Sequence, residues 1–186
     1  MAITNLLGFD SVAEVATPAV PTKTLTWSNP GNANTSSDAT YAEVLETTHL
    51  GSTKYSYWLR YTAPTAGAGV PVGSTITNIY IRVRADADLP GIASASLRDA
   101  VIEGGTDQAN PGIDEVIEWH EFDGNLAYWG IDNTEALAFL HDTGGAFKFY
   151  AALINSGGPT DTAVRVYNAE CRITFDPPAR NRRHVS

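Results

Sequence analysis

Apolar and polar residues alternate along most of this chain with the period of two that is typical of β-strands. The clearest example is the segment 76–86, ITNIYIRVRAD, in which Ile79, Ile81 and Val83 share one face while Arg82 and Arg84 share the other. Further strands are predicted at 24–27, 41–48, 54–62, 93–103, 115–122, 147–154 and 164–175. Gly-Gly pairs at 104–105, 144–145 and 157–158 mark turns between them.

One segment predicts a helix instead. Asn133 and Glu135 are residue types that favour a helix start, and Gly144 favours its end. Such a short helix needs a body to pack on, so we expect it to cap the strands. The sequence therefore predicts an all-β fold, an antiparallel jelly-roll-like β-sandwich with one short helix and with extended N- and C-terminal arms.

The predicted arms divide the chain into 1–22, an N-terminal arm, 23–176, the β-sandwich, and 177–186, a basic C-terminal tail. Pro18 and Pro21 favour extended backbone in the first of these. The candidate partner-binding residues of the two arms are the apolar Ile3, Leu6, Leu7 and Phe9 and the basic Arg180, Arg182 and Arg183. The apolar group needs a surface to cover it, which is either the chain's own body or a neighbouring subunit.

Composition excludes several classes of protein. The 186 residues are 43% hydrophobic and only 18% charged, which indicates a globular chain with a largely neutral polar surface. A net charge of −9 argues against a nucleic-acid partner. Cys171 is the single cysteine, so no intrachain disulfide forms. No 18-residue apolar run predicts a membrane span, no signal peptide is recognised, and we expect assembly in a cytoplasm.

Charge is distributed unevenly. Between Asp99 and Asp142 there are eleven acidic residues and no Lys or Arg, whereas three arginines fall between residues 180 and 183. Arginine grips carboxylates with a planar fork, so the basic tail could bind the acidic region of a neighbouring subunit. A disordered tail is the alternative interpretation.

The polar loop in 26–44, TWSNPGNANTSSDATYAEV, is the first candidate site, with Trp27, Asn29, Asn32, Asp38 and Tyr41 as its marked residues. Its oxygen donors could suggest calcium, which takes six to eight oxygen ligands. One carboxylate among amides is a weak cage, however, and the loop lacks the spacing of a calcium-binding loop. The sequence favours a structural corner whose Asn and Asp side chains cap nearby backbone.

The acidic stretch 113–124, IDEVIEWHEFDG, is the second candidate, with Glu118, Trp119, His120 and Glu121 as a ligand surface. Acids beside an aromatic ring could bind a sugar or a basic partner, and a solvated outer face is the simpler reading. The histidines are scattered without zinc-site spacing, and nucleophile-elbow and nucleotide-binding motifs are absent. We predict no catalytic residues, no metal site and no cofactor.

Several motifs in order resemble a known group of proteins. They are WSNPGNANTSSDATYA, YSYWLRY, GSTITNIYIRVRA, LAYWGIDNTEALAFL and VRVYNAECRITF, spread over residues 24–175. This order resembles β-sandwich virion proteins of tailed bacteriophages, of the capsid-decoration or tail-associated type. The resemblance implies a structural or binding role and supplies no catalytic residues.

The function expected from the sequence is that of a structural virion protein, a capsid decoration (cement) protein on the capsid exterior that stabilises the major capsid shell. Its arms would bridge major capsid subunits or other virion proteins, and a homo-oligomer, with a trimer favoured, would give multivalent attachment. The alternatives are a carbohydrate- or receptor-binding module of a tail fibre, which binds host surface glycans, and a tail or connector component.

Overall fold

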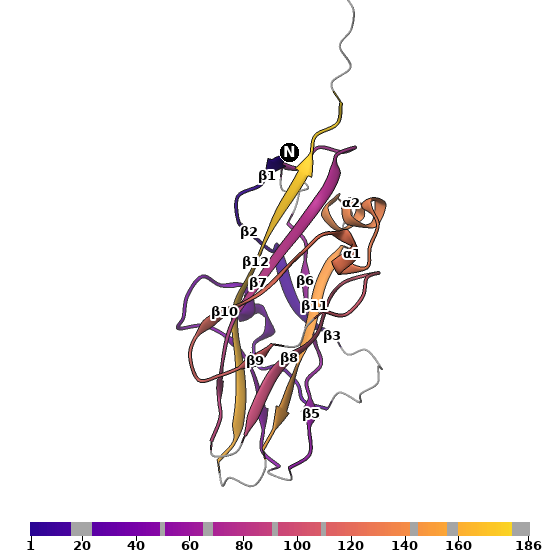
Figure 1. Cartoon of the computed structure of the whole chain (residues 1–186). Helices are drawn as coiled ribbons and strands as arrows, with labels where there is room; N and C mark the ends of the chain where they lie inside the picture. Colours follow the sequence, from indigo (N-terminus) through magenta and orange to yellow (C-terminus); the bar gives the residue numbers. More distant parts are fainter. Residues whose placement is uncertain are drawn as a thin grey trace, which may run out of the picture.

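Two antiparallel β-sheets face each other in the computed structural model of the protein (Figure 1). The structure describes residues 1–15, 24–48, 51–64, 69–90, 93–108, 111–141, 145–155 and 160–179. The predicted antiparallel β-sandwich is confirmed, because the paired strands make two separate sheets with a shared apolar core between them.

The first sheet, sheet A, is built around the long strand β12. Its order is β1–β12–β7–β10, and β2 and β4 also pair with β12. The bounds are β1 Ala2–Ile3, β2 Leu7–Gly8, β4 Ala42–Glu46, β7 Thr75–Asp88, β10 Glu118–Gly124 and β12 Thr162–Asp176. The alternation in 76–86 therefore belongs to a central strand, β7, which is bordered by β12 on one side and by β10 on the other.

The second sheet, sheet B, has the order β3–β6–β11–β8–β9, with β5 also paired to β11. Its strands are β3 Ser11–Val15, β5 Lys54–Tyr55, β6 Trp58–Thr62, β8 Ser94–Ile102, β9 Gly112–Ile113 and β11 Ala146–Ile154. The central strand β11 is buried along most of its length, which explains its nearly continuous apolar sequence.

Two short α-helices and one 3-10 helix complete the described part of the chain: α1 Leu126–Trp129, α2 Asn133–His141 and η1 Pro30–Asn34. The predicted helix is α2, and it begins with a capping box. The Glu135 backbone N–H donates to Asp132 Oδ1 at 2.8 Å, and the Asp132 N–H donates to Glu135 Oε2 at 2.8 Å. The helix α1 was not predicted, because four residues are too few for a helical period to show.

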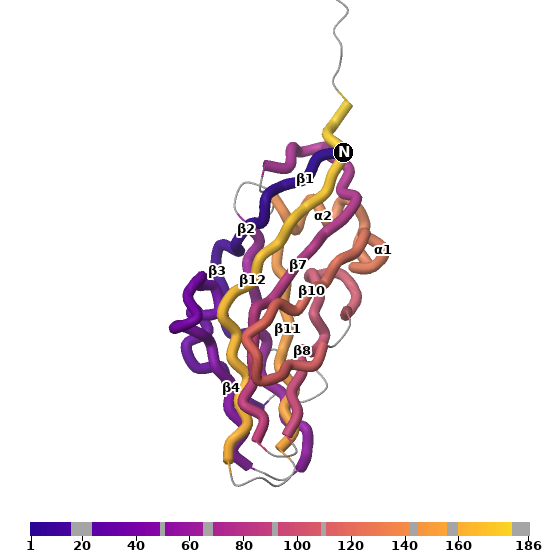
Figure 2. The backbone as a smooth tube through the Cα atoms, turned by 60° about the vertical axis from the view of Figure 1, so that its left-hand side comes forward, coloured from indigo at the N-terminus to yellow at the C-terminus, as the bar shows by residue number. Residues whose placement is uncertain are grey.

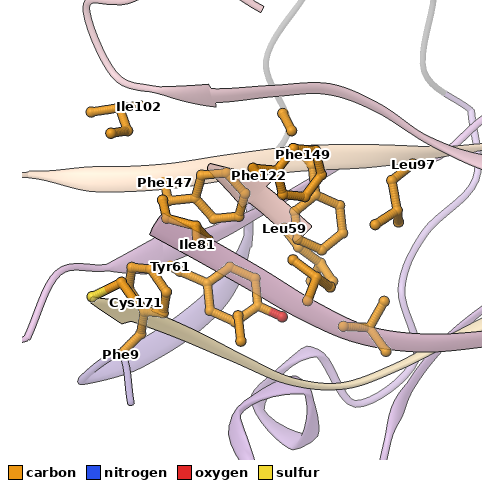
Figure 3. Close-up of a cluster of buried hydrophobic side chains, with 14 of the residues drawn as sticks. Phe9, Leu59, Tyr61, Ile81, Leu97, Ile102, Phe122, Phe147, Phe149 and Cys171 are labelled. Carbon is orange, nitrogen blue, oxygen red and sulfur yellow. The ribbon is translucent and has the colours of Figure 1, made fainter. Parts of the chain in front are cut away.

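The core between the sheets is rich in aromatic rings (Figure 3). Tyr61 of β6 stacks on Phe149 of β11 with ring centroids 5.8 Å apart, and Phe122 of β10 reaches Phe147 at 6.0 Å. The first contact lies within sheet B, and the second joins sheet A to sheet B across the interior. Burial of these rings supplies much of the driving force for folding, since each removes a large apolar area from water.

The N-terminal segment is part of the sandwich and not a free arm, which corrects the predicted extended arm for residues 1–15. Strands β1 and β2 pair with β12 at one edge of sheet A, and β3 then pairs with β6 in sheet B (Figure 2). Phe9, at the crossing between the sheets, is only 4% exposed. Of the two surfaces expected to cover the apolar N-terminal residues, the chain's own body and a neighbouring subunit, the chain's own body therefore covers Phe9.

Two further sequence predictions need comment. Residues 24–27 do not form a strand with a ladder of their own, and only Leu25 makes an isolated bridge, to Ser56. The polar loop that follows turns the chain away before pairing can extend. Residues 16–22 and the tail residues Arg180, Arg182 and Arg183 lie outside the described part of the chain.

Candidate ligand-binding face

The polar loop at 26–44 is held to the body of the sandwich by hydrogen bonds. The indole N–H of Trp27 donates to the Tyr57 carbonyl at 2.9 Å, and the hydroxyl of Tyr61 donates from the core to the Ala33 carbonyl at 3.0 Å. Asn29 takes a left-handed backbone conformation, φ 51°, at the start of η1, where Asn is tolerated well. The Asn32 backbone N–H donates to the Asn29 carbonyl at 2.9 Å and closes the turn.

The polar loop also borders the outward face of sheet A, where Asp38 contacts Arg84. Strand pairing sets the neighbours on that face: Trp119 of β10 lies opposite Arg84 of β7, and Arg84 lies opposite Asn168 of β12. In the next row Arg82 lies between Glu121 and Glu170. Polar and aromatic side chains from three strands therefore form ordered rows across the sheet.

Trp119 is held in place by the arginines of β7. The Arg82 guanidinium lies 4.0 Å from the centre of the indole ring, and that of Arg84 lies 5.9 Å from it. Cation–π attraction at such distances contributes about 0.5–1 kcal/mol at an exposed site. Two Arg82 nitrogens bind one oxygen of Glu170, at 2.9 and 2.6 Å, and fix the guanidinium over the ring. Trp119 remains partly exposed.

A small hollow of about 130 Å³ opens beside Trp119. We call it the Trp119 hollow, and its lining residues are Thr35, Ser36, Asp38, Arg84, Trp119, Tyr167, Asn168 and Glu170. The loop side contributes Asp38, whose carboxylate accepts from Arg84 at 2.8 Å. Both sequence candidates, the polar loop and the acidic stretch, therefore meet at one place.

The charges of the Trp119 hollow are paired. Arg84 is neutralised by Asp38, and Glu170 is neutralised by Arg82, which lies just outside the lining. A net ionic ligand would have to break one of these pairs. A neutral ligand with several hydroxyl groups could instead accept from Arg84 and donate to Asp38 and Glu170 while both pairs persist. The partly exposed indole adds an apolar surface.

The remaining predicted surface residues separate into two groups. Glu121 faces outward and accepts from the Tyr80 hydroxyl at 2.7 Å; burial together with that carboxylate raises the pKa of Tyr80. Glu118 is exposed at the start of β10. His120 points into the sandwich and is buried, so including it in the ligand surface was wrong. Alternation along a strand puts it on the face opposite to Trp119.

His120 is an unusual core residue. Its Nε2 atom is buried without a hydrogen-bond partner among the described residues. Burial lowers the pKa of the imidazole, while the nearby carboxylates of Glu118 and Asp114 act in the opposite direction. The ring is therefore held neutral in the folded protein at neutral pH.

Tyr41, the last marked residue of the loop, packs near the Trp119 hollow rather than in it. Its ring meets that of Tyr167 edge-on at 5.6 Å, and the Arg165 guanidinium lies 5.3 Å from its centre. The Tyr167 hydroxyl donates to the buried Asp86 at 2.9 Å. Burial raises the pKa of Asp86, although Tyr167 and Arg165 partly offset this. These contacts of Tyr41, Tyr167 and Asp86 link the polar loop to strands β7 and β12 of sheet A.

The arm residues are distributed differently from the prediction. Leu7 is half-buried and Phe9 is buried, whereas the side chains of Ile3 and Leu6 are 63% and 39% exposed. The apolar patch is therefore divided, with one part inside the sandwich and the other part available on its surface.

A second hollow, of about 270 Å³, lies on the outward face of sheet B and is lined by Trp58, Asp99, Val101, Glu103, Gly104, Gly105, Asp107 and Lys148. Its tryptophan offers little free surface. Trp58 is buried, with the edge-on ring of Tyr150 at 5.0 Å and the Lys148 ammonium at 5.1 Å from its centre. The Trp119 hollow is therefore the better platform for a ligand ring.

Within the described ranges, no three His, Cys, Asp or Glu side chains come together in a way that could hold a metal ion. Asp38, the only carboxylate of the marked polar-loop residues, is paired with Arg84 instead. None of the helices in the same ranges has the length and apolar character needed to cross a bilayer.

Sequence reasoning missed the residues that complete the Trp119 hollow: Thr35, Ser36, Arg84, Tyr167, Asn168 and Glu170. For Arg84 a signal existed, since the alternation in 76–86 already placed it on the outward face of a half-buried strand. What the sequence could not show was that β10 and β12 both pair with this strand and bring Trp119 and Glu170 to either side of it.

No protein-family model matches this chain, and no curated protein matches it. Among solved structures, the carbohydrate-binding module TmCBM61 in complex with β-1,4-galactotriose aligns over 90% of this chain and 86% of its own, with 10% identity and a TM-score of 0.37. The family 11 carbohydrate-binding module of the cellulase Lic26A-Cel5E of Clostridium thermocellum aligns over 95% and 97%, with 12% identity and a TM-score of 0.33.

The enzymatically active domain of tailspike protein 4 of bacteriophage CBA120 aligns over 93% of this chain but only 19% of its own, with 11% identity and a TM-score of 0.36. All three are weak likenesses, and the fold class of this chain rests on its own strand pairing.

Proposed function

We propose that this chain is a non-catalytic β-sandwich module that binds a neutral carbohydrate on the outward face of sheet A. The observation that carries the proposal is the Trp119 hollow, where a partly exposed indole stands beside two ion pairs that point polar atoms at the same small space. The proposal takes up the carbohydrate-binding alternative from the sequence analysis and assigns it to the Trp119 hollow.

The chemistry of a sugar ring fits this arrangement. One face of a pyranose presents C–H groups, which pack on an aromatic ring, and its rim presents hydroxyl groups that both donate and accept hydrogen bonds. Arg82 covers one face of the indole, so the sugar would stack on the other. Asp38 and Arg84 would supply an acceptor and donors at the rim, because charged groups make the stronger hydrogen bonds.

The size of the Trp119 hollow limits what it can hold. About 130 Å³ accommodates a single sugar unit rather than a long chain. Small sites of this kind give weak affinity for one unit, and repeated copies on one particle or one polymer raise the overall affinity. We therefore expect micromolar or weaker binding by one domain.

A glycan array followed by calorimetric titration of the best ligand tests this function. Trp119→Ala should weaken binding by roughly tenfold, since about 1.5 kcal/mol of stacking is lost. Tyr57→Ala is a matched control, because Tyr57 is also partly exposed but lies outside the Trp119 hollow. No binding to any glycan, or equal binding by the Trp119 variant, would count against the proposal.

Attachment to a virion is a second candidate, and one observation favours it. Ile3 and Leu6 stay exposed although their segment is paired along β12, so a fixed apolar pair faces outward at one edge of sheet A. Such a pair could bind a neighbouring virion protein, such as the major capsid protein, on the capsid exterior. The N-terminal contact would then be a rigid strand edge rather than a flexible arm.

Deleting residues 1–22 would not test this candidate cleanly, because the deletion removes three strands of the body. The double variant I3E/L6E changes only exposed side chains. If the variant attaches to capsid particles as well as the natural chain does, while remaining folded, attachment through this edge is wrong.

A further inference from the structure

A separate surface lies at the end of β7, away from the Trp119 hollow. Leu89, Ala93 and Val116 give it an apolar floor, and Asp114 and Glu115 give it acidic walls, around an open groove of about 450 Å³. We call this the acidic groove. It shares no lining residue with the Trp119 hollow.

Hydrogen bonds hold the acidic groove in shape. The Ala87 backbone N–H at the end of β7 donates to the Asp114 carbonyl at 2.7 Å, and the Val116 N–H donates to Asp114 Oδ1 at 2.9 Å. The short connection from β9 to β10 is therefore fixed against β7, with its side chains turned outward. Val116 is 62% exposed as a result.

The exposed side chain of Val116 lies beside the acidic residues Asp114 and Glu115 in this groove. The lining of the acidic groove contains two carboxylates and no basic residue, and Glu118 is two residues after Val116 in the sequence. Its complement is a short segment with several positive charges and some apolar character. Charge complementarity of this kind steers association and selects the partner.

The chain itself contains such a segment. Residues 180–186, RNRRHVS, hold three of its twelve basic residues, together with Val185. The rest of the chain has nine basic and all 21 acidic residues, so its net charge without this segment is −12. We propose that the acidic groove binds the basic segment 180–186 of a second copy of this chain.

Strand geometry argues that the contact is between copies. Asp176, from which the basic segment continues, pairs with Thr75 at the first residue of β7, whereas the acidic groove lies beyond Asp88 at its last residue. Fourteen residues of β-strand span roughly 43 Å. Arg183 is seven residues after Asp176, a distance of at most about 25 Å of extended chain. The segment therefore falls short of the acidic groove of its own chain.

A contact between two different surfaces has a definite consequence for assembly. Each copy offers one basic segment and one acidic groove, so each copy can bind two neighbours. Such a head-to-tail contact closes into a ring, of which a pair that exchanges segments reciprocally is the smallest, or it continues as an open chain. The predicted homo-oligomer would then be cyclic or extended.

Sedimentation velocity on the full chain, over a range of protein and salt concentrations, tests the proposal. We expect concentration-dependent assembly that weakens on the order of tenfold when NaCl rises from about 50 to about 300 mM, because the contact is between exposed charges. R180E/R182E/R183E should be monomeric, and D114K/E115K should be monomeric as well. D10K/D161K, which makes the same charge change at two exposed positions outside the acidic groove, should assemble normally.

Mixing the two monomeric variants gives the decisive result. R180E/R182E/R183E has an acidic tail, which matches the basic groove of D114K/E115K. D114K/E115K keeps the basic tail, which matches the acidic groove of R180E/R182E/R183E. The mixture should therefore assemble. Circular dichroism establishes that each variant is folded. The proposal is overturned if the natural chain stays monomeric, if either variant assembles like it, or if the mixture of folded variants remains monomeric.

Discussion

Replacing Phe9 by alanine tests whether the N-terminal segment belongs to the folded body. Phe9 is buried where the chain crosses from sheet A to sheet B, and its ring centroid lies 5.4 Å from that of Tyr61 and 6.1 Å from that of Phe147. The Asn34 side-chain amide also donates to the Phe9 carbonyl at 2.7 Å, so the backbone is held at this point. Truncation would leave a cavity that these rigid neighbours cannot close.

The magnitude follows from burial. A buried Phe→Ala substitution costs about 3–5 kcal/mol, from lost apolar transfer and from the cavity. For a domain of this size each kcal/mol lowers the melting temperature by about 2–4 °C, which gives a fall of roughly 6–20 °C. Ile3→Ala is the matched control from the same segment, and its exposed side chain should cost less than about 0.5 kcal/mol.

Urea denaturation followed by tryptophan fluorescence measures both variants under identical conditions. The account predicts a large loss of unfolding free energy for Phe9→Ala and almost none for Ile3→Ala. A loss below about 1 kcal/mol for Phe9→Ala would show that the segment contributes little to the core. The N-terminal arm predicted from the sequence would then be right after all.

Three further changes probe other parts of the fold. Burial lowers the pKa of His120 in the folded protein, so the free energy of unfolding should fall as pH drops below about 6.5, where the imidazole of the unfolded chain gains a proton. His120→Gln should reduce that fall, measured by urea titrations at pH 7.5 and 5.5. An unchanged pH dependence would be contrary evidence. Gly145→Ala places a Cβ 2.2 Å from the Phe139 carbonyl oxygen and should cost about 1–3 kcal/mol in the same titration; an unaltered midpoint would contradict it. Tyr61→Phe removes the hydrogen bond to the buried Ala33 carbonyl and should cost about 1–3 kcal/mol, and thermal melting that matches the natural protein would refute this.

The sandwich could be predicted from the sequence because its long strands carry their own pattern. In 81–85 apolar and polar residues alternate strictly, and β7 has buried and half-buried residues in the same alternation there. The strands at the N-terminus escaped prediction for the opposite reason. β1 and β2 have two residues each, too few for any period, and their partner β12 is more than 150 residues away in the sequence.

The candidate site was predictable only in pieces. Trp119 and Asp38 each stood out within a local motif, but their motifs are about 80 residues apart. Strand order in sheet A and the return of the polar loop toward Arg84 bring them together, and neither property is encoded in a local pattern. The error at His120 has a simpler cause: neighbours in a strand point to opposite faces, so His120 cannot share the outward face with Trp119 and Glu121.

The central claim is that the outward face of sheet A binds the sugar through Trp119, and the indole N–H signals in a ¹H–¹⁵N correlation spectrum test it most directly. The chain has four tryptophans, of which Trp27 and Trp129 donate their indole N–H groups to backbone carbonyls in the interior. On titration with the best glycan, the account predicts a progressive shift of the Trp119 signal while those of Trp27, Trp58 and Trp129 stay in place. A shift at Trp58 with Trp119 unmoved, or no shift in any of the four, would contradict it.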